Sequence, residues 1–379
     1  MNKINILGKA LKLSTTESLM INSVKSFVKN ELSNHIKGVQ DHKKIFQLFG
    51  NEGLLGPTIK GYNCLGTSYK MYGLIAKEIE YLDSGFRSMY SVQSSLIMNP
   101  IYKYCSAHIK EKYLPGLSNG DLIGAFGLTE PNSGSDASKM KTNAVDDGEC
   151  YILNGAKTWI TNSPIADVFI IWAKLDDKVR GFVLDRTMNG IETPEIKDKM
   201  SLMLSKTGMI FLNDVKVPKK NILYIEGMKG PFTCLNSARL GISFGVLGAA
   251  ESCIETAIDY ALNRNLFDTL LAEKQIFQYK LAHAVSEYNI GLIAALSVAE
   301  CIDKNDYIPE MISLIKRNNC SKALDIARTT RDMLGGNGIS SEYSIFRHLI
   351  NLETVNTYEG THDIHSLILG NYLTDHKAY

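Results

Sequence analysis

The spacing of apolar residues changes twice along the chain. From Ser14 to about Leu117 they recur every three or four positions, which is the period of amphipathic helices. Between about Gly120 and Leu223 they form short runs rich in Val, Ile, Phe and Trp, bounded by turn residues, which indicates β-strands. After Gly230 the helical spacing returns. The pattern predicts an α+β protein with an N-terminal helical domain (1–122), a mostly antiparallel middle β domain (123–230) and a C-terminal four-helix bundle (231–379).

Local signals indicate where several elements begin, turn or pack. Ser14-Thr15-Thr16-Glu17 has the form of a capping box for the first helix, and Thr361 is placed to cap a last helix. Asn154-Gly155 lies between two β-rich runs and predicts a hairpin turn. The small residues Gly241, Gly245 and Gly248 allow another helix to approach closely.

Composition and charge narrow the class of protein. The chain of 379 residues is 45% hydrophobic and 21% charged, with a net charge of +1. These values are typical of a soluble enzyme and leave no broad electrostatic footprint for nucleic acid or an acidic membrane. The seven dispersed cysteines favour reduced thiols. No apolar run reaches membrane-spanning length, the longest being Leu240–Ala250, and no secretory signal is visible. We expect a cytoplasmic protein, or a mitochondrial-matrix protein after processing if the source is eukaryotic.

The segment Tyr358-Glu359-Gly360-Thr361 is the strongest candidate for chemistry. Glu359 is a carboxylate beside an aromatic ring, and partial desolvation would raise its pKa and suit it to act as a general base. Gly360 removes a side chain, so that a ligand can approach. The alternative is that Glu359 only complements a helix dipole.

Other motifs have two interpretations each. The loop from Phe126 to Asp136 is dense in hydroxyls and glycines, and it is either an anion- and ring-binding loop or a surface turn. Trp159 is either a core residue or a wall for a planar ring. Arg87, among serines on an apolar helix, is either an internal ion-pair partner or an anion clamp. The glycines after Asp332 can be a simple helix C-cap.

Two classes of site are not expected. His362, Asp363 and His365 lack a second ligand group elsewhere, so we expect no metal. Neither a GxGxxG motif after a strand nor a GxxxxGK[ST] motif occurs, which disfavours Rossmann and P-loop nucleotide sites.

Six motifs in a fixed order carry a family resemblance. FGLTEPNSGSD, KTWITNS, ARLG, Arg-x-x-Phe with a downstream Gln, DMLGGNG and TYEGTHDIH together resemble the acyl-CoA dehydrogenase flavoproteins, and most of all their glutaryl-CoA dehydrogenase branch. The resemblance runs from about Ser14 to Tyr379. It implies a homotetramer with FAD between the β domain and the bundle, acyl-CoA as substrate and an electron-transferring flavoprotein as partner.

The resemblance also implies roles for individual residues. Glu359 would be the catalytic base. The substrate would contact Arg87, Ser88, Ser91, Ser135, Phe232, Leu235, Asn236, Arg239, Tyr358 and Gly360. FAD would contact Phe126, Leu128, Thr129, Gly134, Ser135, Trp159, Ile160, Thr161, Arg264, Phe267, Gln275, Asp332, Leu334, Gly335, Gly336, Thr361, His362 and Asp363, of which Arg264, Gln275 and Asp332 to Gly336 would reach it across a subunit boundary.

The implied reaction is oxidative decarboxylation of glutaryl-CoA to crotonyl-CoA and carbon dioxide, as in lysine and tryptophan degradation. Glu359 would take the α-proton, and a hydride would pass to the flavin. Arg87 would hold the distal carboxylate, with Glu80 close enough to share its charge, and Tyr358 would keep Glu359 in position to return a proton. The alternative is a non-decarboxylating glutaryl-CoA or other short-chain acyl-CoA dehydrogenase. Two other possibilities remain open. One is a scaffold that binds acyl-CoA or FAD without turnover, which the retained Glu359 disfavours. The other is an oxidase that passes electrons to oxygen.

One position departs from the family pattern. The family usually has Arg-x-Gln-Phe-Gly, whereas this chain has Arg264-Asn265-Leu266-Phe267-Asp268. Asp268 places a negative charge where the FAD pyrophosphate is expected, which would weaken cofactor binding.

Overall fold

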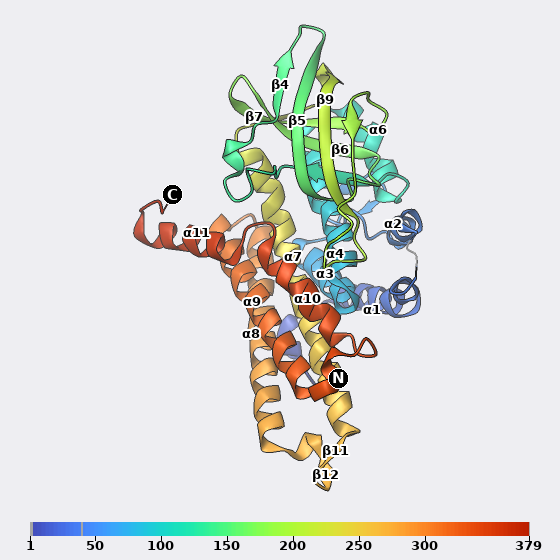
Figure 1. Cartoon of the computed structure of the whole chain (residues 1–379), viewed down its shortest axis with the longest axis vertical. Coiled ribbons are helices and arrows are strands. Elements are labelled where there is room, and N and C mark those ends of the chain that lie inside the picture. The colour runs from blue at the N-terminus through green and yellow to red at the C-terminus, as the bar shows by residue number, and fades with distance from the viewer. Residues whose placement is uncertain (1–2, 39–40, 379) are drawn as a thin grey trace.

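Helices from both ends of the chain pack beside an eight-stranded sheet in the computed structural model, which describes residues 3–38 and 41–378 (Figure 1). The order helical, β, helical confirms the α+β prediction. The N-terminal helices are α1 (Thr15–Asn30), α2 (His42–Asn51), α3 (Tyr69–Leu82), α4 (Ser84–Ser91), α5 (Asn99–Tyr104) and α6 (Ala107–Ser118), with short strands β1 (Lys60–Gly61) and β2 (Cys64–Leu65) between α2 and α3.

The predicted cap of α1 is present. The Ser14 side chain accepts a hydrogen bond from the Glu17 backbone, and the Glu17 carboxylate accepts one from the Ser14 backbone. Both bonds satisfy N–H groups that have no partner within the helix. Ser68 and Asp83 cap α3 and α4 more simply, each by accepting one hydrogen bond, from the Met71 and the Gly85 backbone respectively.

A π-helical segment, Val92–Met98, joins α4 to α5. The extra residue per turn changes which side chains face inward, and π-helical turns are frequent at functional sites. Ser94 and Ser95 both lie buried in this segment. The Ser94 hydroxyl accepts a hydrogen bond from the Gly56 backbone at 3.0 Å, while Ser95 bonds to the hydroxyl of Tyr72.

The middle domain is a mostly antiparallel sheet with the strand order β10-β7-β6-β4-β5-β9-β8. β3 lies off this path and pairs with β6 in parallel. The strands are β3 (Gly124–Gly127), β4 (Asn143–Asp146), β5 (Cys150–Thr161), β6 (Val168–Leu175), β7 (Lys178–Asp185), β8 (Ile191–Glu192), β9 (Thr207–Pro218) and β10 (Ile222–Glu226).

The predicted hairpin at Asn154-Gly155 is wrong. Both residues lie inside β5, which pairs with β9 along its length and shifts register between Leu153 and Gly155. Gly155 has φ +150, and a Cβ there would come 2.4 Å from the hydroxyl of Thr142. Gly155 therefore allows a β-bulge and the close approach of Thr142, the residue before β4. It does not reverse the chain.

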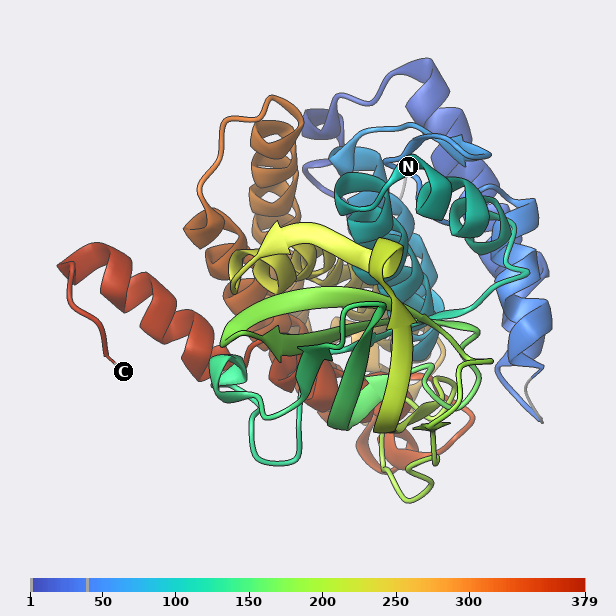
Figure 2. The same cartoon turned by 90° about the horizontal axis from the view of Figure 1, so that it is seen from above.

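The C-terminal helices are α7 (Lys229–Leu262), α8 (Gln275–Asp303), α9 (Pro309–Met333), α10 (Ile345–Thr357) and α11 (His362–Thr374). A small hairpin of β11 (Asn265–Leu266) and β12 (Thr269–Leu270) connects α7 to α8 at the end of the molecule opposite the sheet (Figure 1). The sequence analysis named no helix at α10. α11 extends away from the other helices in both views (Figures 1 and 2).

The glycines of α7 allow α3 and α4 to pack against it. A Cβ at Gly248 would lie 1.9 Å from the carbonyl oxygen of Lys77, and one at Gly245 would lie 2.1 Å from Oε2 of Glu80. One at Gly241 would lie 2.4 Å from the hydroxyl of Tyr72. The predicted close helix approach is confirmed, and it brings polar side chains of α3 and α4 beside α7.

Two helices, α7 and α8, are long and apolar enough to cross a membrane by length and composition. The prediction concerned uninterrupted apolar runs, whereas these two helices reach the length with polar residues in between. In the most apolar stretch of α7, 83% of the residues are buried, as in the core helix of a globular protein. In the corresponding stretch of α8, 44% are buried. Three large apolar side chains of α8, those of Ile276, Tyr279 and Ile290, face outward.

Candidate active site

The loop between α10 and α11 carries Glu359 in an unusual backbone conformation. Glu359 has φ +53 and Gly360 has φ +99. Positive φ is disfavoured for a residue with a Cβ, and such conformations cluster at functional sites. A Cβ at Gly360 would come 2.7 Å from Nε2 of His365, so glycine is required there. Thr361 then caps α11 by accepting a hydrogen bond from the Ile364 backbone at 3.1 Å, as predicted.

The Glu359 carboxylate lies among positive groups without a direct partner. Its Oε2 atom is buried and makes no hydrogen bond within the part of the chain that the structure describes. Burial raises the pKa of Glu359, while the charges of Arg87, Arg239 and Lys316 lower it again, and the pKa remains above its usual value. A carboxylate with a raised pKa and a free oxygen can accept a proton from a ligand placed beside it.

Arg87 is fully buried next to this loop. Its Nε donates a hydrogen bond to Oε2 of Glu80 at 2.5 Å, so the predicted proximity of Glu80 and Arg87 is confirmed. Its Nη2 donates to the Tyr358 hydroxyl, and the guanidinium carbon lies 5.7 Å from the Tyr358 ring centroid. Arg87 is thus an internal ion-pair partner, and it also contacts the residue that precedes Glu359.

A chain of hydroxyl groups lies near the same place. The Tyr72 hydroxyl is 3.2 Å from Oγ of Ser91 and accepts a hydrogen bond from Ser95 at 2.7 Å. Ser95 also accepts one from Ser237 at 3.3 Å. Burial raises the pKa of Tyr72 to about 12, so the phenol stays neutral. Ser88 is buried on the same helix as Ser91. Tyr72 was not predicted from the sequence, because it stands in no motif.

Four expected substrate-contact residues share one face of the first turns of α7. Phe232, Leu235, Asn236 and Arg239 follow the helical spacing of three and four. Phe232 is exposed, whereas Leu235 and Arg239 are buried. Nε of Arg239 donates a hydrogen bond to the Glu359 carbonyl oxygen at 2.7 Å. This face of α7 therefore leads from the surface to the Glu359 loop.

The two loops expected to line a flavin lie side by side. The Thr158 backbone donates to the Thr129 carbonyl at 2.9 Å, and Lys157 donates to the Leu128 carbonyl at 3.0 Å. Lys157 also bonds to Glu130 at 2.9 Å, and Glu130 in turn accepts from two backbone N–H groups. These bonds fix the strand ends that carry the expected residues Phe126, Leu128, Thr129, Gly134, Ser135, Trp159, Ile160 and Thr161.

Trp159 is the exposed tryptophan of this domain. Its residue is 61% exposed and has φ +58, while Trp172 is fully buried in the core. Ile160 beside it is buried, and Gly134 and Ser135 are exposed. Trp159 is therefore not a core residue. Its aromatic face is open near the end of β5 and is available to a planar ring.

A second set of expected cofactor residues lies elsewhere on the chain. Arg264, Phe267 and Gln275 are exposed around the β11–β12 hairpin, which Figure 1 shows at the far end from the sheet. Phe267 and Asp268 form its two-residue turn, with φ +51 and +62. Within one chain, this hairpin is not brought together with Trp159.

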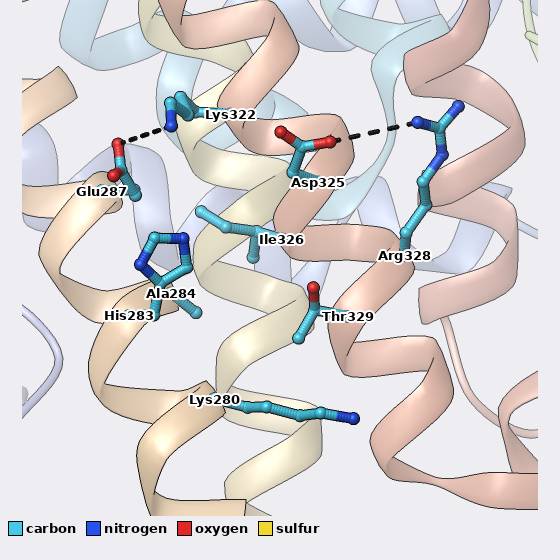
Figure 3. Close-up of a pocket in the computed structure, with 9 residues that line it drawn as sticks. All are labelled: Lys280, His283, Ala284, Glu287, Lys322, Asp325, Ile326, Arg328 and Thr329. Atoms are coloured by element: carbon cyan, nitrogen blue, oxygen red, sulfur yellow. Dashed lines mark ion pairs between the residues drawn. The ribbon is translucent and has the colours of Figure 1, made fainter.

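The glycine-rich turn after α9 also lies on the outer surface. Leu334 is buried, but Gly335 and Gly336 are exposed and open, with no atom within 4 Å of a Cβ built on either. The Asp332 carboxylate pairs with Nζ of Lys280 at 2.6 Å. Lys280 also lines a groove between α8 and α9, which has a volume of about 270 Å³ and whose side chains are drawn in Figure 3. It is lined by Lys280, His283, Ala284, Glu287, Lys322, Asp325, Ile326, Arg328 and Thr329.

A further groove, of about 420 Å³, contains the start of α11. Thr361, His362 and Asp363 line it together with residues of α9 and α10. Nδ1 of His362 is buried and has no hydrogen-bond partner in residues 3–38 and 41–378. Over those same residues, no group of three or more His, Cys, Asp or Glu side chains is arranged to hold a metal ion.

Comparison with known proteins defines the class to which this fold and site belong. The family models for the acyl-CoA dehydrogenase N-terminal, middle and C-terminal domains match residues 14–121, 125–215 and 226–373. The chain therefore belongs to the acyl-CoA dehydrogenase family and is an FAD-dependent oxidoreductase.

Individual relatives cover nearly the whole chain. A crystal structure of a glutaryl-CoA dehydrogenase from Mycobacterium smegmatis in complex with FADH2 is 43% identical, with a TM-score of 0.95 over 98% of this chain and 97% of that one. The structure of a glutaryl-coenzyme A dehydrogenase in complex with glutaryl-CoA is 29% identical, with a TM-score of 0.91 over 97% of each chain. An acyl-CoA dehydrogenase of Bacillus subtilis (strain 168) is 31% identical over 95% of this chain and 98% of its own length.

Proposed function

We propose that the chain oxidises and decarboxylates glutaryl-CoA, giving crotonyl-CoA and carbon dioxide and passing electrons to an electron-transferring flavoprotein. The observation that carries the proposal is the fully buried Arg87, held between Glu80 and Tyr358 directly beside Glu359. A buried guanidinium whose donors are only partly used by Glu80 and Tyr358 offers a partner to a second carboxylate, which a simple short acyl group lacks. The likeness to two glutaryl-CoA dehydrogenases supports the same substrate.

Glu359 acts as the base in this proposal. The thioester carbonyl makes the α-proton of the substrate acidic, and the free buried Oε2 of Glu359 accepts it. The raised pKa of Glu359 brings its proton affinity closer to that of the carbon acid. The face of α7 that begins at the exposed Phe232 and ends at the buried Arg239 guides the acyl-CoA chain inward.

FAD fits the open aromatic and glycine surfaces described above. Trp159 offers an exposed ring, and Gly134 leaves open space for a ligand to approach the backbone. The buried, unpartnered Nδ1 of His362 supplies a polar group for which a ligand could be the partner. When bound, FAD supplies the acceptor for the hydride that leaves the substrate β-carbon. The protein's own task is to place the substrate, hold Glu359 and exclude water.

Arg87 holds the distal carboxylate of the substrate. Its guanidinium has five N–H donors, of which Nε bonds to Glu80 and Nη2 to Tyr358, so donors remain for a second carboxylate. Because Glu80 already shares the positive charge, the hold on the substrate carboxylate is weaker than a lone arginine would give. A weakly held carboxylate can leave as carbon dioxide once the adjacent carbon chain is conjugated. Glu359, protonated in the first step and kept in position beside Tyr358, returns the proton to the product.

We further propose that the active protein is a homotetramer in which FAD bridges two subunits. The second set of cofactor residues, around Arg264, Phe267 and Gln275, lies by the β11–β12 hairpin, at the opposite end of the molecule from β5, the strand that carries Trp159 (Figure 1), so a second copy would supply it. The outward apolar face of α8 and the charged groove in Figure 3 would be covered in the same assembly. We also propose that the enzyme serves lysine and tryptophan degradation, in the cytoplasm or, if the source is eukaryotic, in the mitochondrial matrix.

The visible spectrum tests the proposal. Protein produced with ample riboflavin should be yellow, and anaerobic glutaryl-CoA should bleach the flavin band. Colourless protein that does not reconstitute with FAD would contradict the cofactor assignment. A flavin bleached by butyryl-CoA but not by glutaryl-CoA would instead favour a short-chain acyl-CoA dehydrogenase.

A further inference from the structure

Lys316 of α9 is buried without a carboxylate partner. Its side chain is fully inaccessible, and it forms no ion pair with any acidic group of the described residues. Instead Nζ donates a hydrogen bond to the Tyr358 carbonyl oxygen at 3.0 Å and another to the Gly360 carbonyl oxygen at 2.7 Å. These are the carbonyl groups of the two residues on either side of Glu359.

The loop carbonyls are held by two cations from different helices. Arg239 of α7 donates to the carbonyl of Glu359 itself, so three successive carbonyls, 358 to 360, accept bonds from Lys316 or Arg239. The loop backbone has two consecutive positive φ angles, a conformation that persists only where surrounding contacts hold it. Lys316 supplies two of those contacts at once.

We propose that Lys316 is a positioning residue that holds the Glu359 loop in its strained conformation and so aims the carboxylate at the substrate. The inference rests on the proposed function, in which Glu359 is the base. An apolar side chain of similar size would fill the same volume without the cost of burying a charge. The buried ammonium is therefore explained by the two carbonyls it binds and by the carboxylate between them.

Lys316 also contributes to the charge environment of the base. The groups facing Glu359 are Arg87 from α4, Arg239 from α7 and Lys316 from α9, and the pKa of Glu359 is lowered by all three against the effect of burial. Glu80 from α3 offsets part of the charge of Arg87. His365 of α11 stays neutral because burial lowers its pKa to about 3. Removing the Lys316 charge should raise the pKa of Glu359 further.

The test compares Lys316→Met with Lys199→Met in the FAD-loaded protein. Lys199 is a matched control, since its Nζ also donates to two backbone carbonyls, those of Ser201 and Leu202, but not in the Glu359 loop. Both variants are assayed for anaerobic flavin reduction by glutaryl-CoA across pH, for glutaryl-CoA binding, and for hydrogen exchange of the amides from 358 to 365.

For Lys316→Met we expect flavin reduction to slow by on the order of 10²-fold, the usual effect of misplacing a catalytic group by about 1 Å. Binding of glutaryl-CoA should change little, the half-maximal rate should move to higher pH, and the loop amides should exchange faster. Lys199→Met should match the wild type in all four. An unchanged rate or pH profile in folded Lys316→Met, or the same loss in Lys199→Met, would overturn the inference. If wild-type protein fails to reduce its flavin, the proposed function fails, while hydrogen exchange still reports whether Lys316 holds the loop.

Discussion

The buried pair of Arg87 and Glu80 provides the most informative perturbation. Arg87→Ala removes the group proposed to bind the distal carboxylate, but it also leaves Glu80 buried and unpaired. The Oε1 atom of Glu80 already has no partner among the described residues, and Oε2 would lose its bond to Arg87. Removing one member of a buried pair costs about 3–5 kcal/mol of stability, a large part of the about 5–15 kcal/mol that holds a typical domain folded.

A double variant separates binding from folding. In Glu80→Gln/Arg87→Met both charges are gone, so no uncompensated charge stays in the core and most of the stability should return. The substrate carboxylate, however, still lacks its cation. Losing one partner of such a contact costs about 2–5 kcal/mol, which is a loss in kcat/KM of roughly 30- to several-thousand-fold with glutaryl-CoA. Butyryl-CoA, which has no distal carboxylate, should lose much less.

The assay measures kcat/KM for both substrates with an artificial electron acceptor, and urea unfolding for each variant. We expect Arg87→Ala to be less stable than the double variant, and both to lose their preference for glutaryl-CoA. Equal losses with the two acyl-CoAs, in a variant whose unfolding midpoint equals that of the wild type, would refute the reasoning and make Arg87 a purely structural residue.

Four further outcomes follow from the same geometry. Glu359→Gln should retain FAD and bind acyl-CoA but reduce its flavin at least about 10²–10⁴-fold more slowly; a near-normal rate would place the base elsewhere. Flavin reduction in the wild type should fall as pH drops through a pKa above the ordinary 4.5, because burial raises that of Glu359, and a titration at or below 4.5 would contradict this. Asp268→Gly should lower the FAD dissociation constant by roughly 2- to 30-fold, since it removes a negative charge and suits the positive φ of the turn; titration of apoprotein with FAD measures it. The pKa of His348 is lowered by burial from 6.5 to about 3, so the free energy of unfolding should fall as pH decreases from about 6.5 towards about 3, where only the unfolded chain binds the proton. His348→Leu should flatten that pH dependence in urea unfolding, and an equally steep dependence would exclude His348 as its source.

Several features could be predicted because they depend on neighbouring residues alone. The capping box at Ser14 and the cap at Thr361 need only side chains three residues apart. The Glu80–Arg87 contact was foreseen because the two residues flank one short turn. The succession of helical, β and helical segments follows from apolar spacing, which survives tertiary packing.

Other features depend on contacts between distant segments. Asn154-Gly155 has the composition of a hairpin turn, but its pairing with β9 and the contact with Thr142 place it inside a strand. Lys316 stands in no motif, and its hydrogen-bond partners are backbone carbonyls 42 and 44 residues away. Backbone acceptors leave no mark in a sequence. Trp159 and Trp172 cannot be told apart by residue type, and only the sheet decides which one is exposed.

In the proposed reaction, glutaryl-CoA is oxidised and then decarboxylated at one site. The direct measurement is anaerobic turnover of glutaryl-CoA with an artificial electron acceptor, in which carbon dioxide and the acyl-CoA product are quantified together. We expect equal amounts of crotonyl-CoA and carbon dioxide for each equivalent of acceptor reduced. Stoichiometric glutaconyl-CoA without carbon dioxide would contradict it, and would mean that Arg87 keeps its hold on the carboxylate despite the charge shared with Glu80.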